Sequence, residues 1–395
     1  MSQNLQPTPS IKWNDTKIAF KHLSDIELKR AYFLFSTMSS PVLTDAGVWL
    51  VGLALKLNLP IHSLIKMTLF NQFCGGENID ECTRVVSLLA KYQVGAVLDY
   101  AVEAKESESD FEATCAEIKK TISHAQKTML PFAVFKMSGI ARFDLLNKVS
   151  EQYSLSQDEQ NEWKQVNNRV LSIIKHAQQS GVKILVDAEE SWIQKAIDQI
   201  VEDLMQSFNR KDALVYHTFQ LYRTDRLPYL KKLLEQARSS GYIIGAKLVR
   251  GAYMEKERIR AQKQVYPSPI HSNKDATDRD FNAALQLYPS YSKNLAIFAG
   301  THNEESTSLL TSIAQNNKSI NNDAIVFSQL YGMSDHLSFN LAAHGFLVSK
   351  YLPFGPVKEA LPYLFRRAAE NTSVGGQVSR ELKLIKSEIK RRRLS

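Results

Sequence analysis

From Val94 onward the chain alternates between short apolar runs and longer segments with helical spacing. Eight such runs occur: VGAVLDY (94–100), PFAVFKMS (131–138), VKILVDAE (182–189), LVYHTFQLY (214–222), YIIGAKLVRG (242–251), LAIFAGTHN (295–303), AIVFSQLYG (324–332) and FLVSKYLPFG (346–355). Continuously apolar strands that alternate with helices indicate a parallel sheet covered on both faces. Eight such units over about 280 residues predict an α/β fold, a (β/α)8 TIM-type barrel.

A doubly wound open sheet is the structural alternative to the barrel. The strand end LVRGAY carries a glycine but lacks the GxGxxG spacing of a dinucleotide-binding fold, which favours the barrel. Two connections in the barrel region are long. Residues 141–181 include a helix with Ser156 and Asp158 as cap candidates, and Glu255–Asp280 is polar enough to predict an extended loop covering a cofactor tail.

The residues before the first strand predict an N-terminal helical segment without catalytic residues. The expected helices are Asp25–Phe35, Val42–Leu57, Ile61–Phe70 and Asn78–Tyr92, the last with Asp80 and Glu81 in its first turn. We therefore divide the chain into a helical segment (1–93), the barrel (94–371) and a C-terminal helix (372–395).

Much of the net charge of +8 lies in the last twenty residues, which contain seven Lys and Arg but only two Glu. Val378, Leu382, Ile385 and Ile389 recur there at helical spacing, which predicts a basic amphipathic helix. Such a helix can make a peripheral contact with an anionic membrane or pack on its own domain, and both options stay open. Without a zinc finger, an RNP motif or an aromatic-interleaved basic stripe, we expect no nucleic-acid partner.

Composition indicates a reducing, cytoplasmic setting, with the basic tail leaving peripheral contact at the inner face of the membrane open. Cys74, Cys82 and Cys115 form neither a CxxC pair nor a disulfide framework. No apolar run reaches the roughly 20 residues that span a bilayer. The opening MSQNLQPTPSIKWND has neither the apolar core of a signal peptide nor the arginine-rich character of a presequence.

Polar residues collect late in the apolar runs or directly after them. They are Asp99, Lys136, Asp187, Gln220, Lys247, Arg250, His302, Asn303 and Tyr351. Barrel enzymes carry their chemistry at the carboxyl ends of the strands, so these residues predict an active site.

After the eighth strand and a turn at Pro353–Pro356, a helix brings Arg366 and Arg367 within reach of Glu370. A pair of planar guanidiniums suits a carboxylate or a phosphate. A solvated charged face is the alternative for RRxxE alone, and the polar strand ends make a binding site the better interpretation.

The sequence lacks the residues that several classes of enzyme require. There is no GxSxG elbow, no P-loop and no cysteine at a strand end, and His217 and His302 lack a carboxylate-rich partner set, so we expect no metal. Lys136 and Lys247 in apolar strands allow a Schiff-base aldolase. The excess of cations over carboxylates at the strand ends instead suits an anionic cofactor and a carboxylate substrate.

Four motifs resemble proline dehydrogenase, and the likeness runs in matching order from about Val94 to Asn371. They are AKLVRGAY (246–253), THNEES (301–306), SQLYGM (328–333) and KYLPFGPVKEALPYLFRRAAEN (350–371). The stand-alone, eukaryotic-like type is the more similar. The resemblance implies a distorted (β/α)8 barrel that binds FAD non-covalently. It also implies that L-proline is oxidised to 1-pyrroline-5-carboxylate by hydride transfer to the flavin, with a quinone as electron acceptor.

The resemblance also implies roles for individual residues. Arg366 and Arg367 would hold the proline carboxylate with Glu370 in the same site, and Lys136 and Asp187 would lie beside the substrate and hold each other. The residues implied to form the substrate site are Lys136, Tyr253, Leu330, Tyr351, Arg366, Arg367 and Glu370. Those implied to bind FAD are Asp187, Gln220, Lys247, Val249, Arg250, Gly251, Ala252, Thr301, His302 and Asn303. Lys136, Asp187 and Lys247 are the implied catalytic residues.

Two departures from the bacterial fusion proteins stand out. Lys247 replaces an arginine beside the flavin, as in the stand-alone type, and Met254 replaces a tryptophan on the adenine side. The nearest alternative substrate is hydroxyproline. Its oxidases resemble this chain but have a smaller residue at the position of Tyr351, so we expect a preference for proline. A non-catalytic barrel that binds an anionic partner is the alternative from another class.

Overall fold

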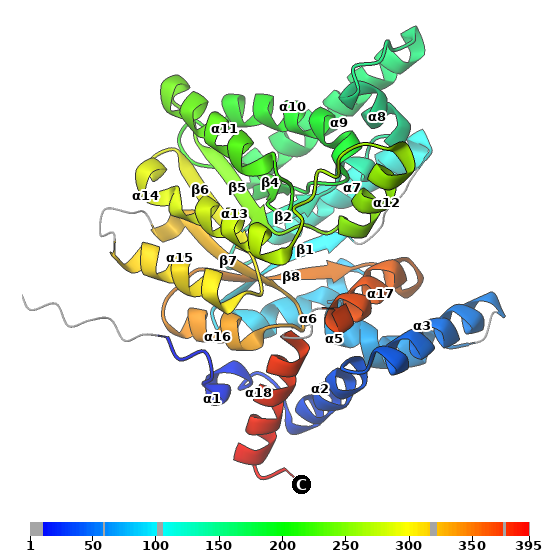
Figure 1. The fold of residues 1–395 in the computed structure, drawn as a ribbon, viewed down its shortest axis with the longest axis vertical. Helices are drawn as coiled ribbons and strands as arrows, with labels where there is room; N and C mark the ends of the chain where they lie inside the picture. Colours follow the sequence, from blue (N-terminus) through cyan, green and yellow to red (C-terminus); the bar gives the residue numbers. More distant parts are fainter. Residues whose placement is uncertain (1–10, 58–59, 101–105, 317–321, 374–376, 395) are drawn as a thin grey trace, which may run out of the picture.

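Eight parallel strands form a closed barrel in chain order, as the sequence pattern predicted (Figure 1). This computed structural model describes residues 11–57, 60–100, 106–316, 322–373 and 377–394. The strands are β1 (Val94–Tyr100), β2 (Phe132–Phe135), β3 (Lys183–Val186), β4 (Val215–Gln220), β5 (Ile244–Val249), β6 (Leu295–Gly300), β7 (Ile325–Leu330) and β8 (Val348–Phe354). β8 pairs with both β7 and β1, which closes the barrel.

Most strands end earlier than the apolar runs suggest, because the polar residues at their ends leave the ladder. β2 stops at Phe135, and Met137–Gly139 form a 3-10 turn, η2. The expected turn at Pro353–Pro356 was placed too early, since Pro353 still lies in β8 opposite Asp99. β7 has already ended beside Tyr351, so proline's missing N–H interrupts no pairing on that side.

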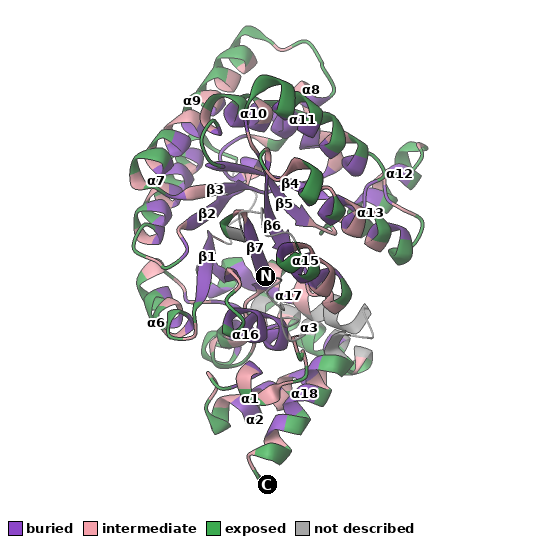
Figure 2. Cartoon of the chain, turned by 90° about the vertical axis from the view of Figure 1, so that its left-hand side faces the viewer, coloured by how far each residue is buried: buried purple, intermediate pink, exposed green. Residues whose placement is uncertain are grey.

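Alternate residues of the strands fill the barrel interior. Buried apolar side chains there include Val97, Phe132, Val134, Leu185, Tyr216, Phe298 and Val326. Because side chains in a strand alternate between two faces, residues two positions beyond these also point inward. Residues in between face the surrounding helices and join the larger core, so that the strands are buried on both faces (Figure 2).

Helices cover the outside of the barrel (Figure 2). They are α7 (Glu108–Ala125), α8 (Phe143–Ser150), α9 (Gln157–Ser180), α10 (Ser191–Phe208), α11 (Arg226–Ser240), α12 (Met254–Gln264), α13 (Lys274–Gln286), α14 (Tyr288–Tyr291), α15 (Glu304–Asn316), α16 (Asp335–Ala343) and α17 (Val357–Ser373). Ser156 caps α9 in a capping box with Glu159. A short turn, η3 (Asn322–Ala324), precedes β7.

The expectation of an extended loop over Glu255–Asp280 was wrong. Helix α12 and the start of α13 occupy most of that stretch. Its Lys, Arg, Glu and Gln residues are good helix formers, and Glu255 and Glu257 lie in the first turn of α12, where the helix dipole favours them. Polarity alone was therefore a poor sign of a loop.

The N-terminal helices form as expected and divide between two cores. They are α1 (Thr16–Ala19), α2 (Asp25–Met38), α3 (Pro41–Lys56), α4 (His62–Ile65), a π-helical turn η1 (Lys66–Phe70), α5 (Asn71–Phe73) and α6 (Ile79–Ala90). Helix α6 packs on β1 and adds Cys82 and Leu89 to the barrel core. Phe35 and Phe73 instead share a second core with Leu364 of α17. Within the described residues, no helix combines the length and apolar character needed to cross a bilayer.

The basic C-terminal helix α18 (Gln377–Arg391) packs on its own domain. It lies against α1 and α2 (Figure 1), and Leu384 and Ile385 are buried in the second core. Leu382 and Ile389 pack at the edge of that core, whereas the side chain of Val378 is outside the described residues. The apolar side of α18 is therefore used inside the molecule, and its cations face outward.

Candidate active site

The polar strand-end residues converge because they continue the inward-facing rows of the barrel. Asp99 lies two residues after Val97, and Asp187 lies two after Leu185. Lys136 follows Val134 by the same step, and all of these positions lie toward the carboxyl end of the barrel. The set that the sequence predicted there therefore shares one barrel mouth, at the end where TIM barrels hold their chemistry.

Asp187 is the centre of this mouth. The Lys247 ammonium donates to Asp187 Oδ1, and the Tyr351 hydroxyl donates to Asp187 Oδ2 at 2.8 Å. Lys247 Nζ also lies 4.5 Å from the centroid of the Tyr351 ring, which adds a cation–π contact. Burial, together with Asp187 and Asp99, raises the pKa of Tyr351 well above its usual value, so its hydroxyl keeps its proton.

Lys136 pairs differently from the expectation. Its ammonium lies 4.0 Å from Asp99 Oδ2, whereas Asp187 is held by Lys247 and Tyr351. The expected mutual support of Lys136 and Asp187 was therefore wrong. Each of the two lysines thus lies beside a different carboxylate.

Residues after β4, β5 and β6 form a second group of donors. The Gln220 side chain accepts from Ala252 N at 3.2 Å and donates to the Glu189 carbonyl at 2.7 Å. It thereby fixes the backbone after β5, where Gly251 has φ of 137°. A Cβ at Gly251 would lie 2.4 Å from the Tyr222 ring, so this close approach requires glycine.

Arg250 is held rigidly with donors to spare. Its Nε bonds Asp278 at 2.6 Å, and its two terminal nitrogens bond Thr301 Oγ1 at 2.7 Å and Ser306 Oγ at 3.0 Å. These bonds use three of the five guanidinium N–H groups, and the described residues leave two for a ligand. Asn303 completes the loop, since its N–H donates to Thr301 Oγ1 and its side chain caps α15 through Ser306 N.

His302 is neutral at physiological pH. Burial, reinforced by the cations Lys350 and Arg367, lowers the pKa of His302 to about 3. Its Nδ1 lies 2.9 Å from Ser334 Oγ, which leaves Nε2 for a ligand. Ser334 N in turn donates to Glu381 Oε2 at 3.0 Å, so the C-terminal helix supports the histidine.

Helix α17 carries the two arginines directly after β8. In Figure 1, α12 and α17 both lie to the right of the strands, beyond β1 and β8. Arg366 and Arg367 are half-buried, and the Arg367 guanidinium lies 5.4 Å from the Tyr363 ring centroid. The side chain of Glu370 lies outside the described residues, so the expected ion-pair arrangement stays a prediction.

The three residues expected to form an apolar wall are only partly brought together. Leu330 and Tyr351 are register partners on β7 and β8 and so lie side by side. Tyr253 is half-buried at the start of α12, where Lys256 Nζ lies 5.4 Å from its ring centroid. Its place in the wall remains a prediction.

Sequence reasoning left two acids out of the site residues. Asp99 was noted at a strand end, but its pairing with Lys136 and proximity to Tyr351 needed the fold. Glu189 accepts from Ser138 N at 3.0 Å and from the Ser138 hydroxyl. Burial raises the pKa of Glu189 to about 7. The inward row Leu185–Asp187–Glu189 is the signal that could have found it.

Other candidate chemistries find no support in the geometry. His217 faces away from the mouth, toward Asp198 of α10 at 2.8 Å. The described residues contain no cluster of three potential metal ligands. The three cysteines are buried free thiols, and burial raises the pKa of Cys82 to about 12.

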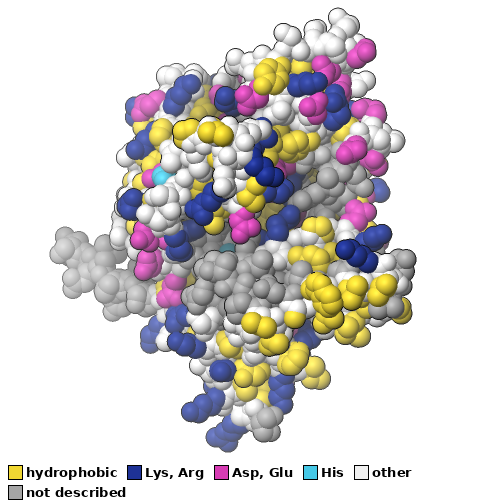
Figure 3. Space-filling model, turned by 45° about the vertical axis from the view of Figure 1, so that its right-hand side comes forward, with side chains coloured by type: hydrophobic (Ala, Val, Ile, Leu, Met, Phe, Trp, Pro, Cys, Tyr) yellow, Lys and Arg dark blue, Asp and Glu magenta, His cyan; other side chains and the backbone are white. Residues whose placement is uncertain are grey.

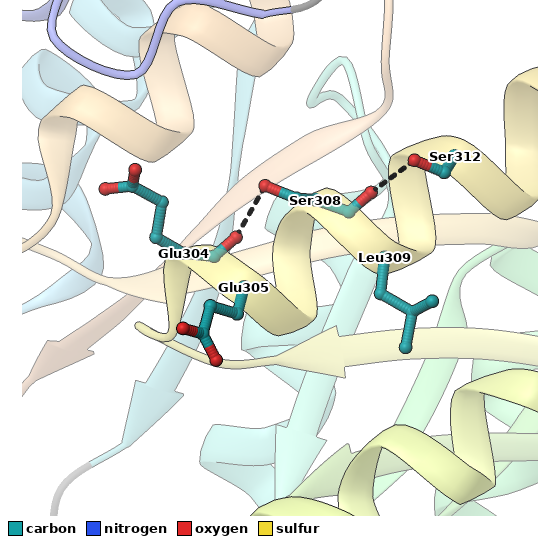
Figure 4. A pocket seen from close by; sticks show the side chains of 5 residues that line it. All are labelled: Glu304, Glu305, Ser308, Leu309 and Ser312. Atoms are coloured by element: carbon teal, nitrogen blue, oxygen red, sulfur yellow. Dashed lines mark hydrogen bonds between the residues drawn. The ribbon is translucent and has the colours of Figure 1, made fainter.

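A hollow of about 560 Å³ lies on α15, outside this set of residues. Glu304, Glu305, Ser308, Leu309 and Ser312 line it, all from one helix (Figure 4). The Ser308 hydroxyl bonds the Glu304 carbonyl, and the Ser312 hydroxyl bonds the Ser308 carbonyl, so the serines are satisfied by their own helix. None of the strand-end residues lines this hollow.

A proline dehydrogenase family model matches residues 82–380. The chain belongs to the proline dehydrogenase family. It is 32% identical to mitochondrial proline dehydrogenase 1 of Dictyostelium discoideum, over 96% of this chain and 74% of that one. As a member of this family it is an oxidoreductase of proline catabolism.

Other relatives carry different names. A carbapenem antibiotics biosynthesis protein, CarD, of Pectobacterium carotovorum subsp. carotovorum is 35% identical over 81% of this chain and 83% of its own. A hydroxyproline dehydrogenase of Xenopus laevis is 29% identical, over 94% of this chain and 88% of its own.

Solved structures agree on the fold. Proline utilization A from Bdellovibrio bacteriovorus, inactivated by N-propargylglycine, superposes with a TM-score of 0.71 at 19% identity. The match covers 93% of this chain and 40% of that longer chain. At this identity the likeness shows a shared barrel fold.

Proposed function

We propose that this chain oxidises L-proline to 1-pyrroline-5-carboxylate with non-covalently bound FAD and passes the electrons to a quinone. The observation that carries the proposal is the buried Lys247–Asp187–Tyr351 group at the barrel mouth, next to donors that have unused N–H groups. Membership of the proline dehydrogenase family supplies the substrate class.

The residues at the mouth fit a flavin dinucleotide by their chemistry. Arg250 keeps two N–H donors and His302 keeps Nε2. Cationic and neutral donors suit the pyrophosphate and the ring edge of such a cofactor. We assign FAD binding to Asp187, Gln220, Lys247, Val249, Arg250, Gly251, Ala252, Thr301, His302 and Asn303.

FAD held by these residues would supply a two-electron oxidant for the ring C–N bond of proline, whose oxidation removes a hydride from the ring carbon next to nitrogen and a proton from the amine. Lys247, held in place by Asp187, would offer a fixed ammonium to negative charge that develops on the bound cofactor, without reorganisation. Asp187 holds that ammonium and is itself held by the Tyr351 hydroxyl. Lys136, held near Asp99, lies on the opposite part of the barrel wall.

Substrate recognition is assigned to α17 and to the wall of β7 and β8. Arg366 and Arg367 would bind the carboxylate by charge-assisted hydrogen bonds, with Glu370 in the same site. Leu330 and Tyr351 would pack on the ring together with Tyr253. The Tyr351 ring fills space that a hydroxyl on the substrate would need, which favours proline over hydroxyproline.

The deciding experiment is an absorption spectrum of the purified protein. We expect a yellow protein whose flavin absorbance is bleached by L-proline in the absence of oxygen and restored by a soluble quinone. A colourless protein that takes up no FAD would contradict the proposal and favour the non-catalytic barrel. Bleaching by hydroxyproline as fast as by proline would instead contradict the substrate assignment.

A further inference from the structure

Exposed apolar side chains gather on the N-terminal helices. Of the sixteen large apolar side chains exposed in the described part of the chain, ten lie between Ile26 and Met67. They are Ile26, Phe33, Val42, Leu43, Trp49, Leu50, Leu53, Leu57, Leu64 and Met67. Single exposed apolar residues are ordinary in soluble proteins, but a contiguous group marks an interaction surface.

Helix α3 carries five of these ten side chains, and Leu57 directly follows it. Val42, Trp49 and Leu53 recur at steps of seven and four, which places them along one side of the helix. Leu57 continues this row just after the helix, since its N–H donates to the Leu53 carbonyl at 3.0 Å. Trp49 is 65% exposed and Leu57 61%. In Figure 1, α3 extends outward at the lower right of the molecule, so this side is a protruding ridge rather than a groove.

The neighbouring surface is cationic. On α18, Lys383, Lys386, Lys390 and Arg391 are exposed, whereas its acids Glu381 and Glu388 are buried. Helix α18 packs on α2, and α2 packs on α3, so cations and apolar residues border one another. Figure 3 shows hydrophobic side chains over the lower right of one face, with Lys and Arg side chains below and to the left of them.

The apolar ridge and the cations beside it favour one of two possible binding partners, a second copy of the chain or an anionic lipid surface. A second copy docked through the same face would bring the α18 cations of both copies together, and like charges oppose that contact. An anionic lipid surface complements both parts, since apolar side chains enter the acyl boundary while lysines and arginines meet the headgroups. Tryptophan is also a preferred residue at that boundary.

We propose that the α2–α3 ridge, flanked by the cations of α18, docks this protein on an anionic lipid bilayer. Helix α3 also contacts α17, which carries Arg366 and Arg367. Resting on the proposed function, this contact would bring the substrate helix, and with it the barrel mouth, close to the bilayer in which a lipid-soluble quinone resides. The proposal assigns membrane contact mainly to α3 and gives α18 an electrostatic part.

The test is sedimentation of the full chain with vesicles, compared between wild type and Trp49→Glu/Leu53→Glu. We expect binding to vesicles that mix phosphatidylcholine with phosphatidylglycerol, and at least about a ten-fold loss of binding in the double variant. Tyr153→Glu is the matched control because Tyr153 is equally exposed, at 62%, but lies outside the ridge. It should bind as wild type does.

A second measurement reports on the ridge directly. Trp49 emission should shift to shorter wavelength when anionic vesicles are added, and Trp49→Phe should lose that shift while still binding. Unchanged sedimentation of the double variant would overturn the proposal. The proposal would also be overturned if the wild type were a dimer, the double variant a monomer, and neither bound vesicles. The ridge would then join two copies of the chain.

Sedimentation and emission need no substrate and no flavin turnover. If the FAD assignment failed, these assays would still decide the docking surface. If docking failed, the proline-bleached spectrum would be unaffected. Turnover with a soluble dye should stay at the wild-type level in the double variant, while turnover with a quinone embedded in the vesicles should fall.

Discussion

The Tyr351 hydroxyl donates a 2.8 Å hydrogen bond to Asp187, which joins the last strand of the barrel to the third across its mouth. Asp187 also binds the Lys247 ammonium. The tyrosine therefore holds the acid that positions the lysine. Under the proposed function its ring would also fill space beside the substrate.

Replacing Tyr351 separates these two roles. Tyr351→Phe keeps the ring and loses the hydrogen bond, so kcat for proline should fall about five- to ten-fold while the preference for proline over hydroxyproline persists. Tyr351→Ser opens the pocket and should move kcat/KM toward hydroxyproline. Steady-state kinetics with both substrates measure the ratio, and equal kcat/KM values for wild type would show that Tyr351 does not select the ring.

The arginines of α17 should act on substrate binding and leave the cofactor in place. Loss of a charge-assisted hydrogen bond of about 2–3 kcal/mol corresponds to a KM for proline raised roughly 30- to 150-fold in Arg366→Ala or Arg367→Ala. Lys358→Ala on the same helix, an exposed cation, is the control. Loss of flavin with an unchanged KM would mean that these arginines hold the cofactor instead.

Glu381 should make stability depend on pH in a defined direction. Burial raises the pKa of Glu381 from 4.5 to about 7, so its contribution to stability is complete below about pH 4.5. That contribution is lost as the pH rises through 7, because the folded state must then hold a buried charge. Glu381→Gln should therefore raise Tm relative to wild type more at pH 8 than at pH 5.

Glu388→Gln on the same helix is the control with the opposite sign. Burial works against the charged form, yet the hydrogen bonds from Arg391 and Arg392 lower the pKa of Glu388. Its contribution is present above its unfolded pKa and is lost as the pH falls. The variant should be less stable than wild type at pH 8, and the deficit should shrink in acid. Parallel Tm profiles for the two variants would contradict the assignment.

The buried ion pairs of α10 and α11 should matter for stability alone. Asp198 accepts from His217 at 2.8 Å and from Arg226 at 2.7 Å. Asp198→Ala leaves those donors buried, which should cost about 3 kcal/mol in the free energy of unfolding. Asp203→Ala, an exposed acid on the same helix, should cost less than about 0.5 kcal/mol. Denaturant titration measures both, and an unchanged KM for proline would confirm the separation from the site.

The barrel could be predicted from the sequence because each strand is a local signal. A continuous apolar run bounded by helical spacing needs no knowledge of its neighbours, and β1 has the bounds that its run predicted. The strand-end polar residues were found in the same way, since Asp187 and Lys247 each interrupt an apolar run. Even the RRxxE helix follows from local spacing.

The contacts between lysines, carboxylates and Tyr351 at the mouth could not be predicted. They depend on which inward-facing side chains of different strands come close to one another in the closed barrel. Lys136 and Asp187 follow adjacent strands, and yet Asp187 bonds Lys247 of β5 and Tyr351 of β8. The polar stretch after Met254 became a helix, as its composition allowed but did not require.

The sequence by itself determined that apolar strands alternate with helices and that cations collect at the strand ends, because those properties are carried by neighbouring residues. Only the tertiary structure decided which carboxylate holds which lysine and which side of each terminal helix remains exposed. The apolar side of α18 became buried against α2, and that of α3 stayed open. The sequence shows α18 to be amphipathic and α3 to be largely apolar. Which of their apolar sides becomes buried depends on packing between segments that are distant in the sequence.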